Sequence, residues 1–133
     1  MIKKIEVVAA AILSQSGQQL FIAKRPDKAH QGGLWEFPGG KKEQNETAVQ
    51  ALTRELHEEV GIVINEPTPL IMLEHDYGDK LIQLDVYCVK TFSGEPHGAE
   101  GQETQWIELA DIDQYSFPDA NLAIIDALKK TFL

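Results

Sequence analysis

The stretch from residue 39 to residue 62 constrains this chain more than any other, because it crowds acidic side chains into a short region. It reads GGKKEQNETAVQALTRELHEEVGI and contains five glutamates, of which Glu55, Glu58 and Glu59 fall inside five positions. Like charges at this spacing repel one another, and a charge is costly to bury. The chain already has a net charge of −9, so the fold must compensate this additional crowding in a specific way.

Residues 46–60 of this stretch are predicted to form a helix, with Asn45 as its N-cap and Gly61 at its end. At about 100° per residue, the apolar side chains occupy one broad arc of the helix: Ala48, Val49, Ala51, Leu52, Leu56 and Val60. Glu55 and Glu59 project into the same arc, while the opposite side is polar. Two carboxylates are therefore expected to face the body of the protein, where an unpaired charge is penalised.

A bound metal ion is the compensation that the sequence favours. Glu58 lies at the rim of the arc, where Arg54 can pair with it at i,i+4, and too few other cations lie nearby to neutralise the rest. Carboxylate ligands favour a hard divalent cation, with Mg²⁺ first and Mn²⁺ as its substitute. The four histidines are scattered along the chain, so no zinc site is indicated.

Magnesium held by carboxylates commonly serves phosphate groups. A Walker A phosphate loop is excluded here, because that pattern requires glycine where Trp35 stands. A metal ion would also explain how a chain with 12 Lys+Arg and 21 Asp+Glu holds a polyanion. We therefore expect metal-assisted attack of water on phosphorus.

Length and composition indicate a single globular domain over residues 1–133, since 43% of the residues are apolar and 25% are charged. The acidic balance argues against a nucleic-acid or anionic-membrane surface. The N-terminal MIKKIEVVAAAIL loosely imitates a signal peptide, but Glu6 interrupts it and a buried strand is favoured. No apolar run approaches the ~18 residues of a transmembrane helix. One cysteine, Cys88, fits a reducing compartment, so we expect a cytoplasmic protein.

The remaining pattern predicts strands mixed with two helices, which is an α/β or α+β sandwich. Strands are expected at residues 6–13, 19–25, 70–77, 81–90 and 105–109, and a closing helix at residues 122–128. Residues 26–40 are too rich in glycine, proline and polar residues for regular structure, and a long irregular segment is usually functional. Alternation in the strand 81–90 gives an apolar face that includes Cys88, which is thus expected in the core rather than as a nucleophile.

The spacing within the acidic stretch also matches a known motif. Gly40, five residues, Glu46, seven residues and then RELHEEVGI form the full Nudix box at residues 40–62, so the chain is identified as a member of the Nudix family. Over nearly its whole length the chain resembles the Nudix enzymes that hydrolyse 8-oxo-dGTP. The segments that carry this resemblance are AH…LWEFPGGK, GEPHGAEGQ, QWIEL and FPDAN. The resemblance implies the Nudix α/β/α sandwich around a mixed β-sheet, with the box as a catalytic loop and helix.

The resemblance further implies roles for individual residues. The metal ligands would be the carbonyl of Gly39 and the carboxylates of Glu55, Glu58, Glu59 and Glu100. Arg54 would complete the catalytic set by orienting the helix carboxylates, and Glu46 would support the junction between loop and helix. The general base stays open among Glu55, Glu58 and Glu100, since a sequence cannot place the attacking water.

Another group of residues aligns with the nucleotide-binding positions of the family: Arg25, His30, Glu36, Phe37, Pro38, Gly39 and Asn121. Without the resemblance, simpler interpretations hold for several of them. Arg25 and His30 would be solvated, Phe37 would belong to the core, and Asn121 would cap the last helix.

The implied activity is Mg²⁺-dependent hydrolysis of 8-oxo-dGTP to 8-oxo-dGMP and pyrophosphate, which sanitises the nucleotide pool. The chain would act as a monomer whose partner is the nucleoside triphosphate. One alternative is a pyrophosphohydrolase of CTP or modified dCTP, because the segments IEVVAAAI and GLWEF also resemble those enzymes. In addition, His97 and Lys80 stand where the 8-oxo-dGTP enzymes have tryptophan and arginine. The other is a non-catalytic Nudix sensor, which the intact box disfavours because binding alone does not require every catalytic carboxylate.

Overall fold

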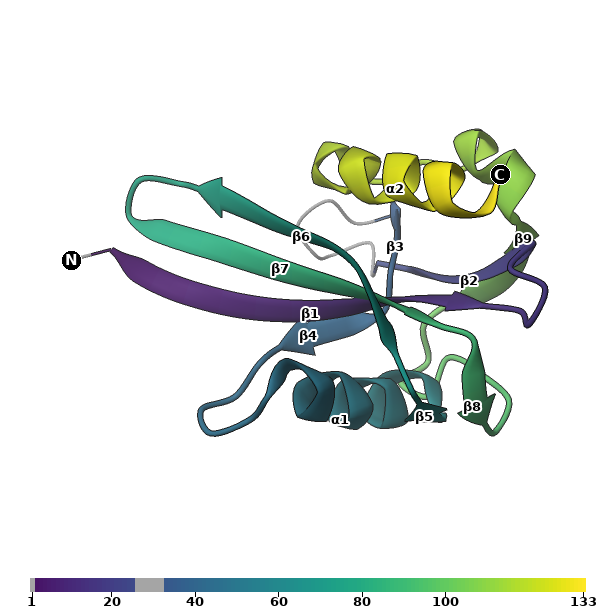
Figure 1. Cartoon of the computed structure of the whole chain (residues 1–133), viewed down its shortest axis with the longest axis horizontal. Coiled ribbons are helices and arrows are strands. Elements are labelled where there is room, and N and C mark those ends of the chain that lie inside the picture. The colour runs from purple at the N-terminus through teal and green to yellow at the C-terminus, as the bar shows by residue number, and fades with distance from the viewer. Residues whose placement is uncertain (1, 26–32) are drawn as a thin grey trace.

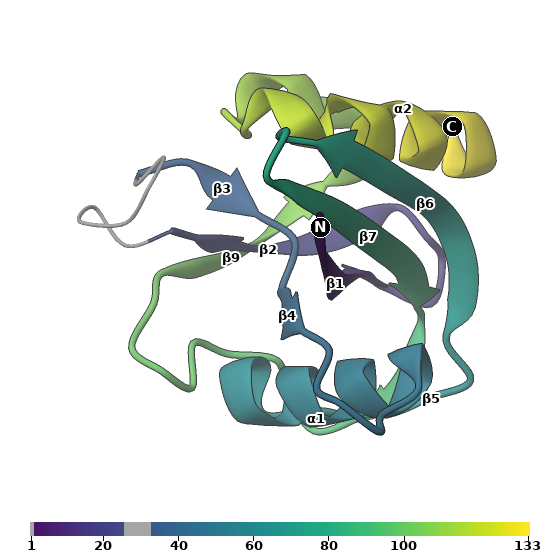
Figure 2. The same ribbon diagram turned by 90° about the vertical axis from the view of Figure 1, so that its left-hand side faces the viewer.

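The computed structural model describes residues 2–25 and 33–133, and it places a layer of strands between two helices (Figure 1). In chain order the elements are β1 (Lys3–Leu13), β2 (Gln19–Lys24), β3 (Trp35–Glu36), β4 (Gly39–Lys41), α1 (Ala48–Val60), β5 (Val63–Asn65), β6 (Thr68–Asp76), β7 (Lys80–Val89), β8 (Thr91–Ser93), β9 (Thr104–Glu108), the 3-10 helices η1 (Leu109–Gln114) and η2 (Asp119–Asn121), and α2 (Leu122–Phe132). The perpendicular view shows α1 and α2 on opposite faces of the strand layer (Figure 2). This is the predicted α/β/α sandwich.

The main sheet is mixed, as expected. β1 pairs in parallel with β7 and antiparallel with β2 and β4. The strand order is β3-β2-β1-β7-β6, with β4 paired to β1 and β9 paired to β2, while β5 and β8 form a separate two-stranded sheet. The register places Gly39 opposite Ala9 and Gly40 opposite Val8. The short strand that precedes α1 is thereby anchored to the middle of the central strand.

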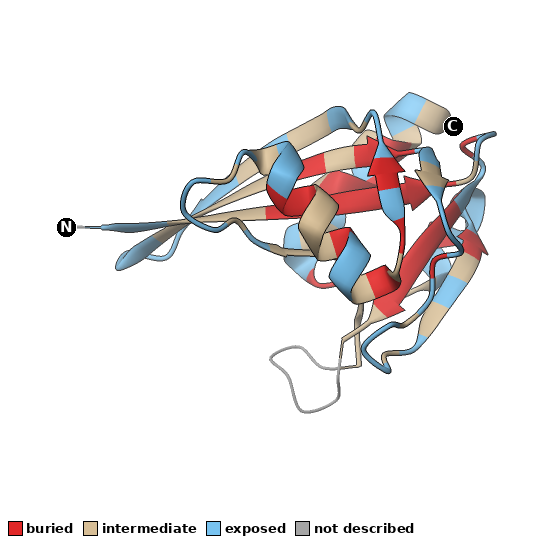
Figure 3. Cartoon of the chain, turned by 90° about the horizontal axis from the view of Figure 1, so that it is seen from below, coloured by how far each residue is buried: buried red, intermediate tan, exposed pale blue. Residues whose placement is uncertain are grey.

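The strand β1 is buried on both faces, which explains its continuous apolar run. Alternate residues pack into two cores: Val8, Ala10 and Ile12 under α1, and Ala9, Ala11 and Leu13 under α2. The buried face of α1 points toward the strands and its opposite face toward solvent (Figure 3). Cys88 is buried in the core under α2, so the prediction that it is a core residue is confirmed.

The start of α1 differs from the prediction. The helix begins at Ala48, and its N-cap is Thr47, so the assignment of Asn45 as N-cap was wrong. The Thr47 Oγ1 atom accepts a hydrogen bond from the backbone N of Gln50 at 3.1 Å, and the Gln50 Oε1 atom accepts one from the backbone N of Thr47 at 2.8 Å. This capping box satisfies two free donors of the first turn. Gly61 ends the helix as predicted, with a left-handed φ of 73°.

Several short or terminal elements were not predicted. The described part of 26–40 contains the strands β3 and β4, because backbone groups can pair with a neighbouring strand whatever the side-chain composition. The pair of β5 and β8 was also missed, and α2 continues to Phe132. The strands expected at residues 70–77 and 81–90 are confirmed as β6 and β7, which pair antiparallel as a hairpin. Within the described chain, no helix has the length and apolarity needed to cross a membrane.

Candidate active site

The helix α1 presents Glu55 and Glu59 to the strand β4, as its apolar arc predicted. The Glu59 Oε2 atom accepts a hydrogen bond from the backbone N of Gly39 at 3.0 Å. The Glu55 carboxylate lies over Gly40, where a Cβ atom would overlap it, so glycine leaves the room that this carboxylate needs. The side chain of Glu55 is 14% exposed and that of Glu58 is 54% exposed. Glu58 therefore lies at the solvent edge of the acidic group.

Arg54 holds the loop before α1 against the helix. Its Nε and Nη2 atoms donate to the two oxygens of Glu46 at 2.8 and 2.9 Å, and Nη2 also donates to the Lys41 carbonyl at 3.2 Å. Its Nη1 atom donates to Glu55 Oε1 at 2.9 Å. The predicted pair with Glu58 is present but longer, at 3.6 Å, so Glu46 is the main partner. The hydrogen bonds from Arg54 lower the pKa of Glu46 to about 2, which keeps this anchor charged.

The carboxyl group of Glu59 is partly removed from water and surrounded by other acids. Its pKa is raised to about 8, chiefly by burial and further by the charges of Glu55, Glu100 and Glu36, against the opposing hydrogen bond from Gly39. A cation bound here would favour the ionised carboxylate and remove this penalty. The crowding inferred from the sequence is therefore present in the folded protein.

These side chains fit a hard divalent cation, because their donor atoms are carboxylate oxygens. Across residues 2–25 and 33–133, no group of three or more His, Cys, Asp and Glu side chains is already arranged to hold a metal ion. Two carboxylates have other partners instead: Glu55 accepts from Arg54, and Glu59 accepts from Gly39. Metal binding at this helix would therefore require some of the carboxylates to turn away from their present partners.

The loop that carries Glu100 is attached to the last turn of α1. The backbone N of Ala99 donates to the Glu59 carbonyl, and that of His97 donates to the Val60 carbonyl, both at 3.0 Å. Carbonyls of the last helical turn have no partner inside the helix, so the loop supplies the bonds that they lack. The structure thus brings Glu100, whose side chain is exposed, to the same end of α1 as Glu59.

A cleft of about 310 Å³ lies beside β4, between β1 and the start of α2. Its volume is at the lower end of the range of small-molecule sites, roughly 300–1,000 Å³. It is lined by five of the residues expected to bind the nucleotide: Arg25, Glu36, Phe37, Gly39 and Asn121. The Arg25 Nη1 atom donates to Glu36 Oε2 at 2.7 Å. Because Gly39 also donates to Glu59, the cleft adjoins the acidic helix.

The other expected nucleotide-binding residues have different positions. Pro38 is buried, and its carbonyl accepts a hydrogen bond from the backbone N of Ala10 at 2.9 Å. His30 lies outside the described residues. Phe37 combines both interpretations, because it lines the cleft and also stacks on Phe117 with ring centroids 5.3 Å apart. Asn121 stands at the N-cap position of α2, as the simpler interpretation expected, but its side chain makes no capping bond to the helix.

Other residues that line the cleft were not singled out from the sequence. Val7, Val8 and Ala9 of β1 are among them, and the rest of the group is Leu84, Pro118, Ala120 and Ile124, which lie outside β1. A signal existed for three of them. Pro118 and Ala120 belong to the FPDAN motif, and Leu84 lies on the apolar face of its strand. The sequence could not tell that this face extends beyond the core into an open cleft.

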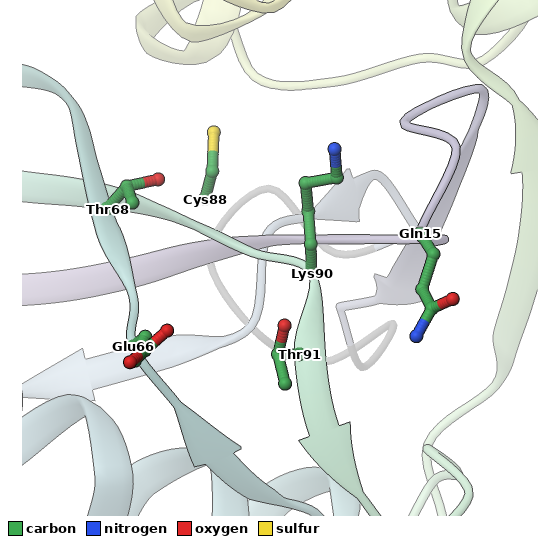
Figure 4. Close-up of a pocket in the computed structure, with 6 residues that line it drawn as sticks. All are labelled: Gln15, Glu66, Thr68, Cys88, Lys90 and Thr91. Atoms are coloured by element: carbon green, nitrogen blue, oxygen red, sulfur yellow. The ribbon is translucent and has the colours of Figure 1, made fainter.

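A second cavity, of about 370 Å³, lies among residues of β6, β7 and β8 and of the turn after β1 (Figure 4). It is lined by Gln15, Glu66, Thr68, Cys88, Lys90 and Thr91. This lining combines one carboxylate, Glu66, with one ammonium group, Lys90, and contains none of the expected site residues. The residues expected from the sequence to bind the nucleotide therefore gather at the smaller cleft and not at this cavity.

Carboxylates on a helix, facing a glycine strand beside a small-molecule cleft, are suited to metal-dependent hydrolysis of phosphate anhydrides. Hydrolases of this class include the NUDIX domain, and the NUDIX domain family matches residues 8–127 of the chain. The chain belongs to the NUDIX family.

Relatives of known activity and structure agree with this family over nearly the whole chain. The 8-oxo-dGTP diphosphatase of Escherichia coli (strain K12) is 39% identical over 128 residues, covering 96% of this chain and 98% of that protein. The CTP pyrophosphohydrolase of the same organism is 36% identical over 125 residues, covering 94% and 91%. A solved MutT structure, from work on Aliivibrio salmonicida and Vibrio cholerae, has a TM-score of 0.90 at 40% identity and covers 98% of this chain and all of that one. The predicted family and fold are confirmed.

Proposed function

We propose that this protein is a Nudix pyrophosphohydrolase that converts 8-oxo-dGTP to 8-oxo-dGMP and pyrophosphate, and so removes an oxidised nucleotide from the pool. The proposal rests on the junction between the cleft and the acidic helix, which is formed at Gly39. This residue lines the cleft, and its backbone N donates to the half-buried carboxyl group of Glu59. A triphosphate whose nucleoside occupies the cleft would extend its phosphates along this junction. The 39% identity to an 8-oxo-dGTP diphosphatase over nearly the full chain supports the choice of substrate.

The proposed cofactor is Mg²⁺, with Mn²⁺ as a substitute. The groups proposed to hold it are the Gly39 carbonyl and the carboxylates of Glu55, Glu58, Glu59 and Glu100. When bound, a divalent cation neutralises charge on phosphate oxygens and on the leaving group. The exposed Glu58 and Glu100 are the carboxylates with most freedom to move toward such an ion.

The side chains of the protein would supply orientation and proton transfer. Arg54 fixes Glu55 by a hydrogen bond of 2.9 Å and anchors the loop through Glu46, so its proposed role is to orient the helix carboxylates. A carboxylate, Glu55, Glu58 or Glu100, would take the proton of the attacking water. Attack is proposed at the β-phosphorus, which leaves the α-phosphate on the nucleoside. Hydrolysis in ¹⁸O-water should then label pyrophosphate, and label in the monophosphate would contradict this route.

In the cleft, Arg25, Glu36, Phe37 and Asn121 are proposed to bind the nucleoside. The ion pair of Arg25 with Glu36 provides a polar end. Leu84 and Ile124 provide apolar surface for the flat faces of a base. The side-chain amide of Asn121 would contact the edge of the base. His30, proposed from the resemblance, would act from outside the described part of the chain.

The decisive experiment is a substrate panel of 8-oxo-dGTP, dGTP, CTP and 5-methyl-dCTP with Mg²⁺, scoring kcat/KM and the phosphate product. We expect 8-oxo-dGTP to have the highest kcat/KM and pyrophosphate to appear. Preference for CTP or 5-methyl-dCTP would favour the second candidate, which the 36% identity to a CTP pyrophosphohydrolase supports. Binding without turnover of any nucleotide would instead indicate a non-catalytic sensor.

We also propose that residues 1–133 form one domain that works as a monomer in the cytoplasm, without a nucleic-acid or membrane partner. The net charge of −9 and the single buried cysteine support this setting. Light scattering of the purified chain would test the monomer.

A further inference from the structure

The side chain of Gln102 joins two acidic residues at the end of α1. Its Nε2 atom donates to the backbone carbonyl of Glu59 at 2.9 Å, and its Oε1 atom accepts from the backbone N of Glu100 at 2.9 Å. One amide therefore connects the last turn of the acidic helix to the loop residue whose negative charge acts on Glu59.

The chemistry of these two bonds requires an amide. The Glu59 carbonyl already accepts from the backbone N of Ala99 and takes a second donor from position 102, while the Glu100 N–H takes an acceptor from the same side chain. An amide side chain carries one donor group and one acceptor. A glutamate at position 102 would place an oxygen against the Glu59 carbonyl oxygen. A methionine, of similar length, would provide neither strong bond. The two partners also determine which atom of the amide is the nitrogen.

The surrounding loop gives Gln102 a fixed place. A Cβ atom on Gly98 would overlap the Gln102 carbonyl, so the chain closes tightly around this residue. The backbone N of Gly101 donates to the Gly98 carbonyl at 3.0 Å, and Gly101 has a left-handed φ of 84°. The N–H of Glu100 is directed at the Gln102 side chain within this turn. The orientation of the backbone that carries the Glu100 side chain therefore depends on the amide.

We propose that Gln102 is a positioning residue, which fixes Glu100 relative to Glu59 so that both carboxylates can serve one site. The inference rests on the proposed function, in which both belong to the metal site. Glu100 itself is exposed, and a long side chain on a surface loop loses conformational freedom when it is ordered. Fixing its backbone in advance reduces that cost. The fold does not depend on this amide, because the backbone bonds of Ala99 and His97 still attach the loop to α1.

The first test uses the metal-free protein and compares Gln102→Met with Gln105→Met. Gln105 is a matched control, since its amide is exposed and donates to Tyr115 Oη at 3.3 Å. Loss of the acceptor should speed amide hydrogen exchange at Glu100 about tenfold or more in Gln102→Met and leave it unchanged in Gln105→Met. Unchanged exchange at Glu100 in Gln102→Met would overturn the proposal, whatever the activity of the protein.

The second test asks whether Gln102 acts through Glu100. At saturating Mg²⁺, Gln102→Met should lower kcat about tenfold in the otherwise intact protein, but less than roughly twofold when Glu100 is already glutamine. Equal losses in the two backgrounds, or a wild-type kcat in Glu100→Gln, would overturn the proposal. If the unmodified protein hydrolyses no nucleotide in the panel, the proposed function fails. Comparing the Mn²⁺ affinity of Gln102→Met with that of the unmodified protein, with and without Glu100→Gln, then still decides the role of Gln102.

Discussion

At the scale of single residues, the candidate site depends on two positions where a side chain is absent. A Cβ atom on Gly39 would overlap the backbone carbonyl of Val8, so β4 can approach β1 only with glycine there. A Cβ atom on Gly40 would overlap the carboxylate of Glu55. The Nudix resemblance marks Gly40 as required, but the sequence does not say which atoms come close. The steric reason is a tertiary contact, and the structure supplies it.

Glu59 is the residue whose charge should matter most for turnover. Glu59→Gln keeps the shape of the side chain and an oxygen for the Gly39 N–H, but it removes the negative charge. We expect kcat to fall at least roughly 100-fold, since stabilisation of charge by a bound metal contributes several kcal/mol. The measurement is steady-state kinetics at saturating Mg²⁺. Glu108→Gln is the control, because Glu108 is exposed and accepts only a surface bond from Gln19 at 3.1 Å among the side-chain contacts described. Near-normal turnover of Glu59→Gln would contradict the metal-helix assignment.

Asn121 should decide how an oxidised guanine is distinguished from guanine. Guanine presents N7 and O6 as adjacent acceptors, and oxidation at C8 converts N7 into an N–H donor. The Asn121 amide carries one donor and one acceptor, so it can bond both atoms of 8-oxoguanine but meets the lone pair of N7 in guanine. A mismatch of this kind costs ~1–3 kcal/mol, or roughly ten- to a hundred-fold in discrimination.

Asn121→Ala is therefore expected to raise KM for 8-oxo-dGTP far more than for dGTP and to narrow the ratio of their kcat/KM values. Asn121→Asp is the matched variant, because it keeps an acceptor for N7–H and loses the donor for O6. Steady-state kinetics with both nucleotides and a melting curve provide the measurement. An unchanged substrate ratio would remove Asn121 from the base-binding site.

At the scale of elements, the two ends of α1 differ in how far the sequence predicts them. Gly61 ends the helix because glycine adopts the left-handed conformation without a Cβ penalty, which is a local property. At the start, both Asn45 and Thr47 are residue types that cap helices, and the choice depends on a reciprocal bond. The signal was the spacing of Thr47 and Gln50, a capping box, which identifies the true start.

Thr47→Ala should test that start. The substitution removes the hydroxyl that accepts from the Gln50 backbone N, so the free energy of unfolding should fall by about 1 kcal/mol. Thr53→Ala is a matched control, because Thr53 lies inside the same helix and its hydroxyl bonds only the Val49 carbonyl of the preceding turn among the contacts described. That control should be neutral or slightly stabilising. Urea denaturation of both variants provides the measurement, and equal stability of Thr47→Ala and wild type would refute the cap.

At the scale of the whole molecule, local patterns predicted most of the layers and long-range pairing did not follow from them. The run in β1 and the alternation in β7 indicated buried strands, and the arc of α1 indicated which face it covers. The parallel pairing of β1 with β7, the β5–β8 pair and the attachment of Gln102 to Glu59 join distant segments. Their partners are selected by tertiary packing, which no local propensity encodes.

Charges spread over the molecule affect stability in separate ranges of pH. The pKa of Glu46 is lowered to about 2, so its contribution is present above the ordinary value of 4.5 and is lost only as pH falls toward 2. The pKa of Cys88 is raised by burial to about 11, so it changes stability only above its ordinary value of 9.0. The pKa of Glu59 is raised to about 8, so Glu59 changes stability between its ordinary value of 4.5 and about 8. Burial raises the pKa of Glu36 as well.

The metal-free protein should therefore become less stable as pH rises from about 5.5 to about 8.5, because folded Glu59 binds a proton that the unfolded chain has already released. Glu59→Gln cannot lose that proton, so its melting temperature should fall less over the same range, and the remaining slope reports Glu36 and other groups. Adding Mg²⁺ should stabilise the unmodified protein more at the higher pH, where the ion meets an ionised carboxylate without displacing a proton. Melting curves in a chelator and in Mg²⁺ at both pH values test this expectation. Equal losses of melting temperature in the unmodified protein and in Glu59→Gln would show that Glu59 is ionised over the whole pH range. Burial and the acidic neighbours would then not raise its pKa.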